Sequence, residues 1–122
     1  MKKAVVIGGS GFIGSHLADH LSKKGYQVTI YDCSRSKWFS KNQKMVIGDV
    51  LDIEKLNQTI SGAQVVYNFA ALADLNQAFN QPEKTININI LGNLNVMSAC
   101  HSQGVERFIY ASTVYVHSRE GG

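Results

Sequence analysis

The stretch Ala4-Val5-Val6-Ile7-Gly8-Gly9-Ser10-Gly11-Phe12-Ile13-Gly14 decides the fold. Its first four residues form a short apolar run that is typical of a strand buried on both faces of a parallel sheet. The glycines that follow satisfy GxxGxxG at positions 8, 11 and 14 and GxGxxG at positions 9, 11 and 14. Ile13, Leu17 and Leu21 then recur at helical spacing until Gly25 ends the pattern. The stretch therefore predicts a strand, a tight glycine-rich turn and a helix.

The rest of the chain continues this alternation of strands and helices. We expect a helix at Asp52–Ile60 and further strands at Gln27–Tyr31, Lys44–Ile47, Gln64–Phe69 and Val105–Ala111. Such an alternation predicts the α/β class, as a doubly wound parallel (Rossmann) sheet with right-handed crossovers and helices on both faces. The expected order of its five strands is 3-2-1-4-5.

The segment from Pro82 to Gln103 is locally ambiguous. Its residues 85–90 read Thr-Ile-Asn-Ile-Asn-Ile and alternate with period two, as a half-buried strand would. The whole segment is too long for a strand, and its apolar residues recur at helical spacing, at Ile86, Ile90, Leu94 and Met97. Proline suits a first helical turn and Gly104 suits a carboxyl-terminal cap. We therefore predict one long helix, with Asn87, Asn93 and Asn95 at exposed positions.

Length and composition indicate one globular domain over residues 1–122. Hydrophobic residues make up 44% of the chain and charged residues 17%, with one proline. The formal charge of +3 is scattered and forms no dense basic run, so no nucleic-acid partner is expected. No apolar stretch approaches the roughly 20 residues of a membrane span, and glycines interrupt the first apolar run before it could serve as a secretion signal.

The cysteines and histidines give no sign of a metal site. Cys33 and Cys100 lie far apart and no CxxC spacing occurs, so neither a disulfide framework nor a zinc site is predicted, and a reducing cytoplasm is expected. His16 and His20 share a helix face, but no third ligand accompanies them. We expect no metal.

The glycine-rich turn predicts a phosphate site. A pyrophosphate needs a tight strand-to-helix turn, a backbone without Cβ that it can approach, and the positive end of a helix dipole. Gly8, Gly11 and Gly14 meet these needs, with close packing of the helix on the strand as the less favoured role for Gly14.

Asp32 gives the second element of this site. It ends the second expected strand roughly 20 residues beyond the turn, where a carboxylate accepts hydrogen bonds from both hydroxyls of an adenosine ribose. The same carboxylate repels a 2′-phosphate, so NAD is the expected cofactor. Arg35 and Lys37 follow closely and leave NADP as the less favoured alternative.

With these residues the chain resembles the NAD-dependent epimerase/dehydratase family, the extended branch of the short-chain dehydrogenases. The run from Gly8 to Leu17 is similar to the family's opening turn, and the resemblance implies cofactor contacts from Ser10, Phe12 and Ile13. Gly48-Asp49-Val50 resembles the place where an aspartate meets the adenine amino group, which implies that Asp49 and Val50 contact the cofactor.

The second half of the chain carries the same resemblance. Phe69-Ala70-Ala71, with Ala73 close behind, is similar to the segment that passes beside the ribose and nicotinamide end of the cofactor. Asn89 resembles the first asparagine of a family helix and would brace the cofactor site, or simply pin neighbouring backbone. Two positions depart from the family, which often has histidine where this chain has Asn68 and glycine where it has Val116.

The resemblance also implies catalytic residues. Arg107–Tyr115 is similar to the strand that delivers a catalytic serine or threonine, and Ser112 and Thr113 are both candidates. The family's YxxxK motif is absent: Tyr115 is followed four residues later by Arg119, which does not replace lysine, and the pair comes too early in the chain. We therefore expect the substrate-binding part to be missing and this chain alone to be inactive.

These features predict the cofactor half of an NAD-dependent epimerase, dehydratase or reductase that acts on a nucleotide sugar by hydride transfer. Two alternatives stay open: a module that binds or senses NAD without turnover, and a reductase of a small carbonyl compound. The expected partner is a small-molecule substrate, and a homo-oligomer is possible because missing elements would leave apolar surface uncovered.

Overall fold

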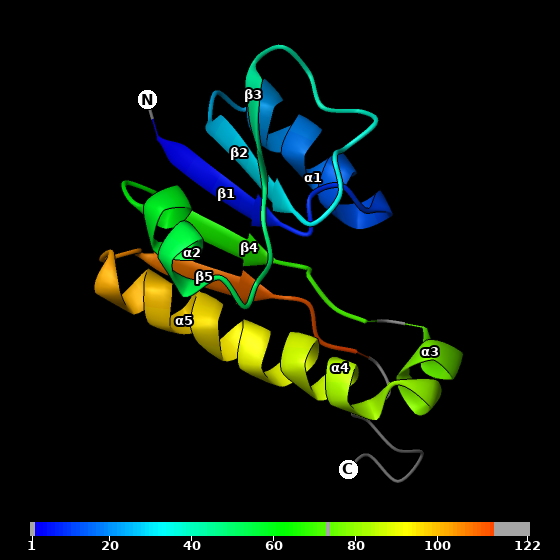
Figure 1. Cartoon of the computed structure of the whole chain (residues 1–122). Helices are drawn as coiled ribbons and strands as arrows, with labels where there is room; N and C mark the ends of the chain where they lie inside the picture. Colours follow the sequence, from blue (N-terminus) through cyan, green and yellow to red (C-terminus); the bar gives the residue numbers. More distant parts are fainter. Residues whose placement is uncertain (1, 73, 114–122) are drawn as a thin grey trace, which may run out of the picture.

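The computed structural model describes residues 2–72 and 74–113. It contains one parallel five-stranded sheet in the order β3-β2-β1-β4-β5, which confirms the predicted topology (Figure 1). The strands are β1 (Lys3–Ile7), β2 (Gln27–Asp32), β3 (Gln43–Ile47), β4 (Val65–Asn68) and β5 (Arg107–Tyr110). The helices are α1 (Phe12–Lys23), α2 (Ile53–Ile60), α3 (Leu75–Asn80), α4 (Pro82–Ile86), the π-helical η1 (Asn87–Gly92) and α5 (Asn93–Ser102).

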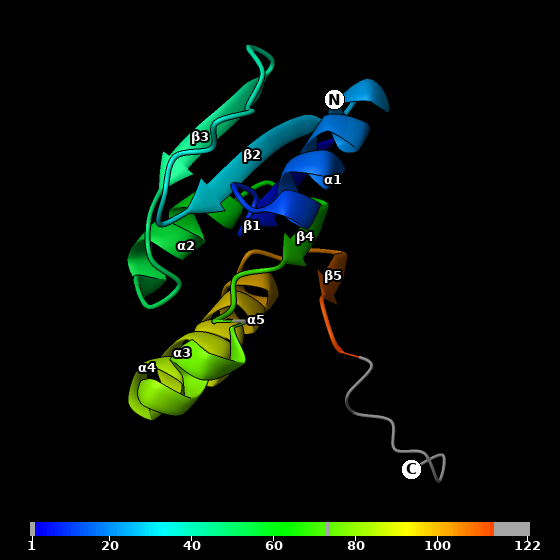
Figure 2. The ribbon, with the colours of Figure 1, turned by 90° about the vertical axis from the view of Figure 1, so that its right-hand side faces the viewer.

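Helices cover the sheet from both sides. Figure 2 shows α1 on one face and α2 and α5 on the other. Two clusters of buried apolar residues correspond to these layers. One cluster contains Val5, Ile7 and Val66 together with residues of α2 and α5. The other contains Ala4 and Val6 together with residues of α1. The chain therefore has the three-layer packing of a doubly wound fold.

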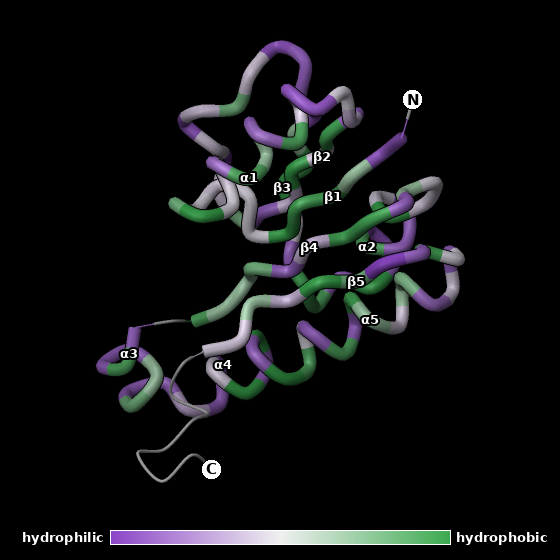
Figure 3. Tube along the Cα trace, turned by 180° about the vertical axis from the view of Figure 1, so that it is seen from behind, coloured by the Kyte–Doolittle hydropathy of each residue, from purple (hydrophilic) through white to green (hydrophobic). Residues whose placement is uncertain are grey.

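The strand β1 lies at the centre of the sheet and has no exposed apolar side chain. Its residues Ala4, Val5, Val6 and Ile7 are each 0% exposed, because β2 and β4 flank the strand and helices cover both its faces. Figure 3 shows the hydrophobic colour concentrated along these central strands. The continuous apolar run in the sequence thus corresponds to a strand buried on both faces, as predicted.

The direction of the crossovers changes between β1 and β4. From β1 the chain passes through α1 to β2 and β3 on one side, and then returns through α2 to β4 and β5 on the other side. The carboxyl ends of β1 and β4 therefore diverge into loops that leave in opposite directions. In open α/β sheets, ligands bind in the crevice at this point.

The predicted long helix is present, with one local difference. The elements α4, η1 and α5 follow one another without a break from Pro82 to Ser102, and η1 is a six-residue π-helix. The apolar side chains Ile86, Ile90, Leu94 and Met97 are all exposed, between 47% and 61%. The core contacts of α5 come instead from Val96, Ala99 and Cys100.

Two further features bear on the expectations from the sequence. The short helix α3 was not predicted. On α1, Ile13 is 64% exposed, and Ala18 and Leu21 belong to the buried face of that helix.

Within the described ranges, no helix has the length and apolar character needed to cross a membrane.

Candidate functional site

A crevice of about 470 Å³ opens at the carboxyl ends of β1, β2, β3 and β4. It lies where the direction of the crossovers changes. Eight of the residues singled out in the sequence line it together: Gly8, Gly11, Asp32, Asp49, Val50, Phe69, Ala70 and Ala71. Residues from four separate loops thus converge on one crevice.

The glycine-rich turn forms one end of the crevice. Gly8 has a φ of +78°, and a Cβ at this position would lie 2.7 Å from the backbone N of Ala70. A Cβ at Gly14 would lie 2.7 Å from the Cα of Gly9 and even closer to the carbonyl oxygen of Gly8. At Gly11, by contrast, a Cβ would meet only that oxygen, at 3.5 Å. Gly8 and Gly14 therefore allow the backbone to pack, whereas Gly11 leaves open space beside the crevice.

The amino terminus of α1 is suited to an anion. Gly11 is its N-cap, and no side chain caps the first turn. The first N–H groups of a helix have no intrahelical partner and carry the positive end of the helix dipole. Phe12 and Ile13 occupy this first turn, are 78% and 64% exposed, and are not among the residues that line the crevice.

Asp32 connects the glycine-rich turn to the loop after β2. Its Oδ2 accepts a hydrogen bond from the backbone N–H of Ser10 at 3.0 Å, and its Oδ1 accepts one from the N–H of Ser34 at 3.2 Å. The Ser10 hydroxyl donates to the carbonyl oxygen of Ser34 at 2.6 Å. Arg35 stacks on the ring of Phe39 at 4.9 Å and does not line the crevice.

Asp49 and Val50 form the wall next to β3. Asp49 is exposed, and its Oδ1 accepts a hydrogen bond from the N–H of Leu51 at 2.9 Å. Val50 is buried among core residues of the α2 and α5 side. The hydroxyl of Tyr31 donates to the Asp49 carbonyl oxygen at 2.6 Å. Burial raises the pKa of Tyr31 to about 12, helped by the carboxylates of Asp52 and Asp49, so this phenol stays a neutral donor at ordinary pH.

Asparagine side chains hold the wall next to β4. The side-chain amide of Asn89 makes two hydrogen bonds to the backbone of Leu72. Its Oδ1 accepts from Leu72 N–H at 2.8 Å, and its Nδ2 donates to Leu72 O at 3.3 Å. The buried Asn68 donates to Asn93 Oδ1 at 2.9 Å and accepts from Ala70 N–H at 3.1 Å. Asn89 therefore pins backbone beside the crevice, in agreement with one of the two roles expected for it.

The prediction that Asn87, Asn93 and Asn95 are exposed is wrong. All three are half-buried, Asn93 binds Asn68, and Asn95 donates to the carbonyl oxygen of Val50 at 3.1 Å. Asn95 binds a backbone carbonyl group of the loop after β3, and Asn93 binds the side chain of Asn68 at the end of β4, so the helix face is polar where it meets these two segments.

The candidate catalytic residues lie apart from the lining residues. Ser112 and Thr113 are exposed and follow β5, and the N–H of Ala111 just before them donates to the carbonyl oxygen of Asn68 at 3.2 Å. This bond places them beside the carboxyl end of β4, next to the crevice wall. Ala73, Tyr115 and Val116 lie outside the described residues.

Seven further residues line the crevice: Ile7, Tyr31, Cys33, Gly48, Leu72, Lys84 and Ile88. Lys84 is the cation of the described lining. Most of them directly flank a motif residue, which would have been a usable signal. Lys84 and Ile88 lie on α4 and η1, and only the packing of the long helix brings them there.

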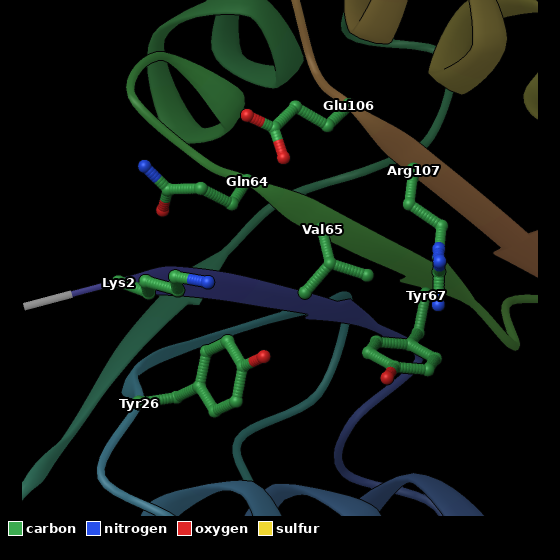
Figure 4. Close-up of a pocket in the computed structure, with 7 residues that line it drawn as sticks. All are labelled: Lys2, Tyr26, Gln64, Val65, Tyr67, Glu106 and Arg107. Atoms are coloured by element: carbon green, nitrogen blue, oxygen red, sulfur yellow. The ribbon is translucent and has the colours of Figure 1, made fainter.

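A second hollow of about 420 Å³ lies at the opposite, amino ends of β1, β4 and β5 (Figure 4). Tyr26, Val65 and Tyr67 face it on the α1 side of the sheet, with Lys2 and Arg107 at its rim. It contains none of the candidate cofactor-binding or catalytic residues and lies away from the glycine-rich turn. Ligands of such sheets bind at the carboxyl ends of the strands, so we assign the functional site to the other crevice.

These features define a Rossmann-type dinucleotide-binding domain. The chain belongs to the NAD dependent epimerase/dehydratase family, whose model matches residues 4–121.

Two curated relatives and two solved structures illustrate the family. UDP-glucose 4-epimerase of Rhizobium meliloti is 30% identical, covering 89% of this chain and 34% of that protein. The decarboxylating sterol-4-alpha-carboxylate 3-dehydrogenase of Bos taurus is also 30% identical, covering 94% of this chain and 31% of that protein. The chain thus spans about a third of the length of these relatives.

The structural matches cover nearly the whole chain. MoeE5 in complex with UDP-glucose and NAD has a TM-score of 0.86 at 29% identity, over 95% of this chain and 38% of that one. The epimerase Mth375 of Methanothermobacter thermautotrophicus has a TM-score of 0.86 at 35% identity, over 93% of this chain and 35% of that one. The strand order and the family resemblance inferred from the sequence are both confirmed.

Proposed function

We propose that the crevice binds NAD, with the pyrophosphate at the amino terminus of α1 and the adenosine between Asp32 and Asp49. The observation that carries this proposal is the open space at Gly11, beside an uncapped helix terminus and opposite the carboxylate of Asp32. The family name and the NAD bound to MoeE5 support the same cofactor.

Asp32 would face the adenosine ribose. Its two oxygens each accept one backbone N–H and retain lone pairs that ribose hydroxyls can use. A 2′-phosphate there would meet a carboxylate instead of a cation, since Arg35 is stacked on Phe39. NAD is therefore preferred over NADP.

We propose further that the protein to which this chain contributes the cofactor half acts on a nucleotide sugar. When bound, NAD accepts a hydride from the substrate or returns it. Ser112 or Thr113, at the end of β5, would donate a hydrogen bond to the reacting oxygen. The nucleotide-sugar names among the relatives favour this substrate class.

A second candidate substrate is an alcohol or ketone that is not attached to a nucleotide. The likeness to the bovine sterol dehydrogenase favours it, at the same 30% identity as the rhizobial epimerase. Assaying any longer product of the same gene with UDP-glucose and with a sterol alcohol, while following absorbance of NADH, separates the two. A downstream sequence without YxxxK would instead support a module that binds NAD without turnover.

The cofactor assignment can be tested on this chain directly. Calorimetric titration with NAD and NADP should give a measurable affinity for NAD and a weaker one for NADP. Tighter binding of NADP would contradict the role given to Asp32, and binding of neither would contradict the function assigned to the crevice.

Self-association, which the sequence left possible, stays a proposal. The exposed Ile86, Ile90, Leu94 and Met97 along the long helix form the kind of apolar surface that proteins cover by association or by further elements of their own chain. Sedimentation over a range of concentrations would distinguish a monomer from a dimer.

A further inference from the structure

Side chains from three different elements hold the backbone after β3. The hydroxyl of Tyr31 in β2 donates to the carbonyl oxygen of Asp49 at 2.6 Å, and Nδ2 of Asn95 in α5 donates to that of Val50 at 3.1 Å. Nζ of Lys55 in α2 donates to the carbonyl oxygen of Ile47 at 2.9 Å. Three carbonyl groups within four residues are thus bound by side chains distant from one another in sequence.

The contact with Tyr31 is close enough to fix the path of the chain. Tyr31 is completely buried, and a Cβ at Gly48 would lie 2.5 Å from its hydroxyl oxygen. The backbone therefore passes directly over the phenol, and glycine is required for it to do so. Because the hydroxyl lies at the end of a rigid ring packed in the core, it fixes the position of the backbone at Asp49, just after β3.

The contact with Asn95 fixes the next residue. The side chain of Val50 packs on Gly92, where a Cβ would lie 2.5 Å from Cγ2 of Val50. Asn95, almost one turn further along the helix, binds the carbonyl oxygen of the same valine. The valine is consequently held by packing on its side chain and by a hydrogen bond to its backbone.

The residue held between these contacts presents its carboxylate to the crevice. Asp49 is exposed and lines the crevice, and its Oδ1 accepts the N–H of Leu51. In the described part of the chain, Oδ2 of Asp49 accepts no hydrogen bond, so it is available to a donor on a ligand. The position of that oxygen depends on the backbone that Tyr31 and Asn95 hold.

We propose that Tyr31 and Asn95 are positioning residues that fix Asp49 for a purine bearing an exocyclic amino group, and so set a preference for adenine over hypoxanthine. This inference rests on the proposed binding of NAD in the crevice. Recognition groups must be held within about 0.5 Å of their productive position to discriminate between such bases. Asn95 is not among the residues that line the crevice, so its effect on a ligand passes through the backbone that it binds.

A purely structural role would have a different signature. If the two hydrogen bonds only stabilised the fold, their loss would weaken the binding of all dinucleotides equally, or would leave the binding of all of them unchanged. If they position Asp49, their loss weakens the binding of a dinucleotide whose base donates an amino N–H. The binding of a dinucleotide whose base carries a carbonyl group at the same place stays almost unchanged.

The experiment compares NAD with nicotinamide hypoxanthine dinucleotide by calorimetric titration of the wild-type chain, Tyr31→Phe and Asn95→Ala. We expect each substitution to weaken NAD binding by about three- to tenfold, which corresponds to the loss of one hydrogen bond. Binding of the hypoxanthine dinucleotide should change by less than about twofold by the same reasoning. The ratio of the two affinities therefore falls.

Matched controls are available on the same chain. Tyr67→Phe removes a tyrosine hydroxyl on the opposite face of the sheet, and Asn57→Ala removes an amide that binds only within α2 and to Gln103. Neither should change the ratio. Thermal unfolding of every variant reports whether it folds. Should Tyr31→Phe fail to fold, Asn95→Ala still tests the inference, because it changes a side chain on the helix and not one in the core.

The outcomes separate this inference from the proposed function. Failure of the wild-type chain to bind either dinucleotide would contradict NAD binding and, with it, this inference. If the wild-type chain binds NAD but the folded variants keep its affinity ratio, or if the wild-type chain does not discriminate at all, the positioning role is wrong while NAD binding stands.

Discussion

The carboxylate of Asp32 accepts a hydrogen bond from the backbone N–H of Ser10, with 3.0 Å between N and Oδ2, across 22 residues of sequence. The glycine-rich turn after β1 and the loop after β2 are thereby joined even without a ligand. Ser10 strengthens the connection through its hydroxyl, which donates to Ser34 O. Asp32 thus has a structural role in addition to the proposed contact with ribose.

Substitution of Asp32 should separate these two roles. Asp32→Ala removes the acceptors of Ser10 and Ser34 and should lower the free energy of unfolding by about 1.5–3 kcal/mol, as for hydrogen bonds to a charged group. It should also weaken NAD binding and narrow the preference for NAD over NADP, because the carboxylate no longer repels a 2′-phosphate. Urea unfolding and calorimetric titration measure the two effects.

Asp32→Asn is the control for that experiment. The amide oxygen can still accept one backbone N–H, so most of the stability should be retained while the charge is lost. An Asp32→Ala chain with the wild-type ratio of NAD to NADP affinity would show that this carboxylate does not face the ribose.

Gly11 and Gly14 should respond differently to alanine. A Cβ at position 14 meets the backbone of Gly8 and Gly9, which has no room to yield, so Gly14→Ala should cost about 1–3 kcal/mol of stability, as overpacking does. A Cβ at position 11 makes only an ordinary contact at 3.5 Å, so Gly11→Ala should fold normally. It should nevertheless bind NAD more weakly, since the methyl group occupies the space proposed for the pyrophosphate.

Urea unfolding and NAD titration of both variants test this pair. Equal destabilisation of the two variants would contradict the geometry of the turn. Wild-type affinity for NAD in Gly11→Ala would contradict the placement of the pyrophosphate.

The two cysteines give a test of occupancy that needs no enzyme activity. Cys33 is exposed and lines the crevice, whereas Cys100 is buried and its burial raises the pKa of the thiol to about 11. A thiol reagent at neutral pH should modify Cys33 quickly and Cys100 only on unfolding, because the thiolate is the reactive form. Bound NAD should slow the modification of Cys33.

Mass spectrometry after short exposure to the reagent measures both rates. Cys33→Ser removes the fast reaction and confirms its assignment. If saturating NAD left the rate at Cys33 unchanged, the dinucleotide would have to bind away from the end of β2.

Much of the fold was predictable because its signals are local. A buried strand, a glycine-rich turn and an amphipathic helix each follow from a few adjacent residues, and the right-handedness of crossovers then restricts the strand order. The convergence of Gly8, Asp32 and Asp49 followed from the same order, since the carboxyl ends of parallel strands meet at one edge.

The long helix could not be predicted in detail from the sequence. Counting at 3.6 residues per turn assumes a continuous α-helix, but Asn87–Gly92 is π-helical and has more residues per turn, which shifts every later side chain around the axis. Asn93 and Asn95, which follow this segment, therefore contact Asn68 and Val50, while Leu94 is exposed. Which face is polar depends on the loops it binds, and those are distant in sequence.

The pH dependence of stability gives a last test of the environment of Tyr31. Burial raises the pKa of this phenol from its usual 10.0 to about 12. The neutral form is thus favoured by the fold, and this stabilisation is fully present below pH 10 and is lost as the pH rises through 12. Between those values the free energy of unfolding by urea should fall more steeply for the Cys100→Ala chain than for the same chain with Tyr31→Phe. The Cys100→Ala background removes the buried thiol, whose own raised pKa acts in an overlapping range. Parallel profiles for the two chains would mean that the Tyr31 hydroxyl reaches water and does not hold the carbonyl group of Asp49.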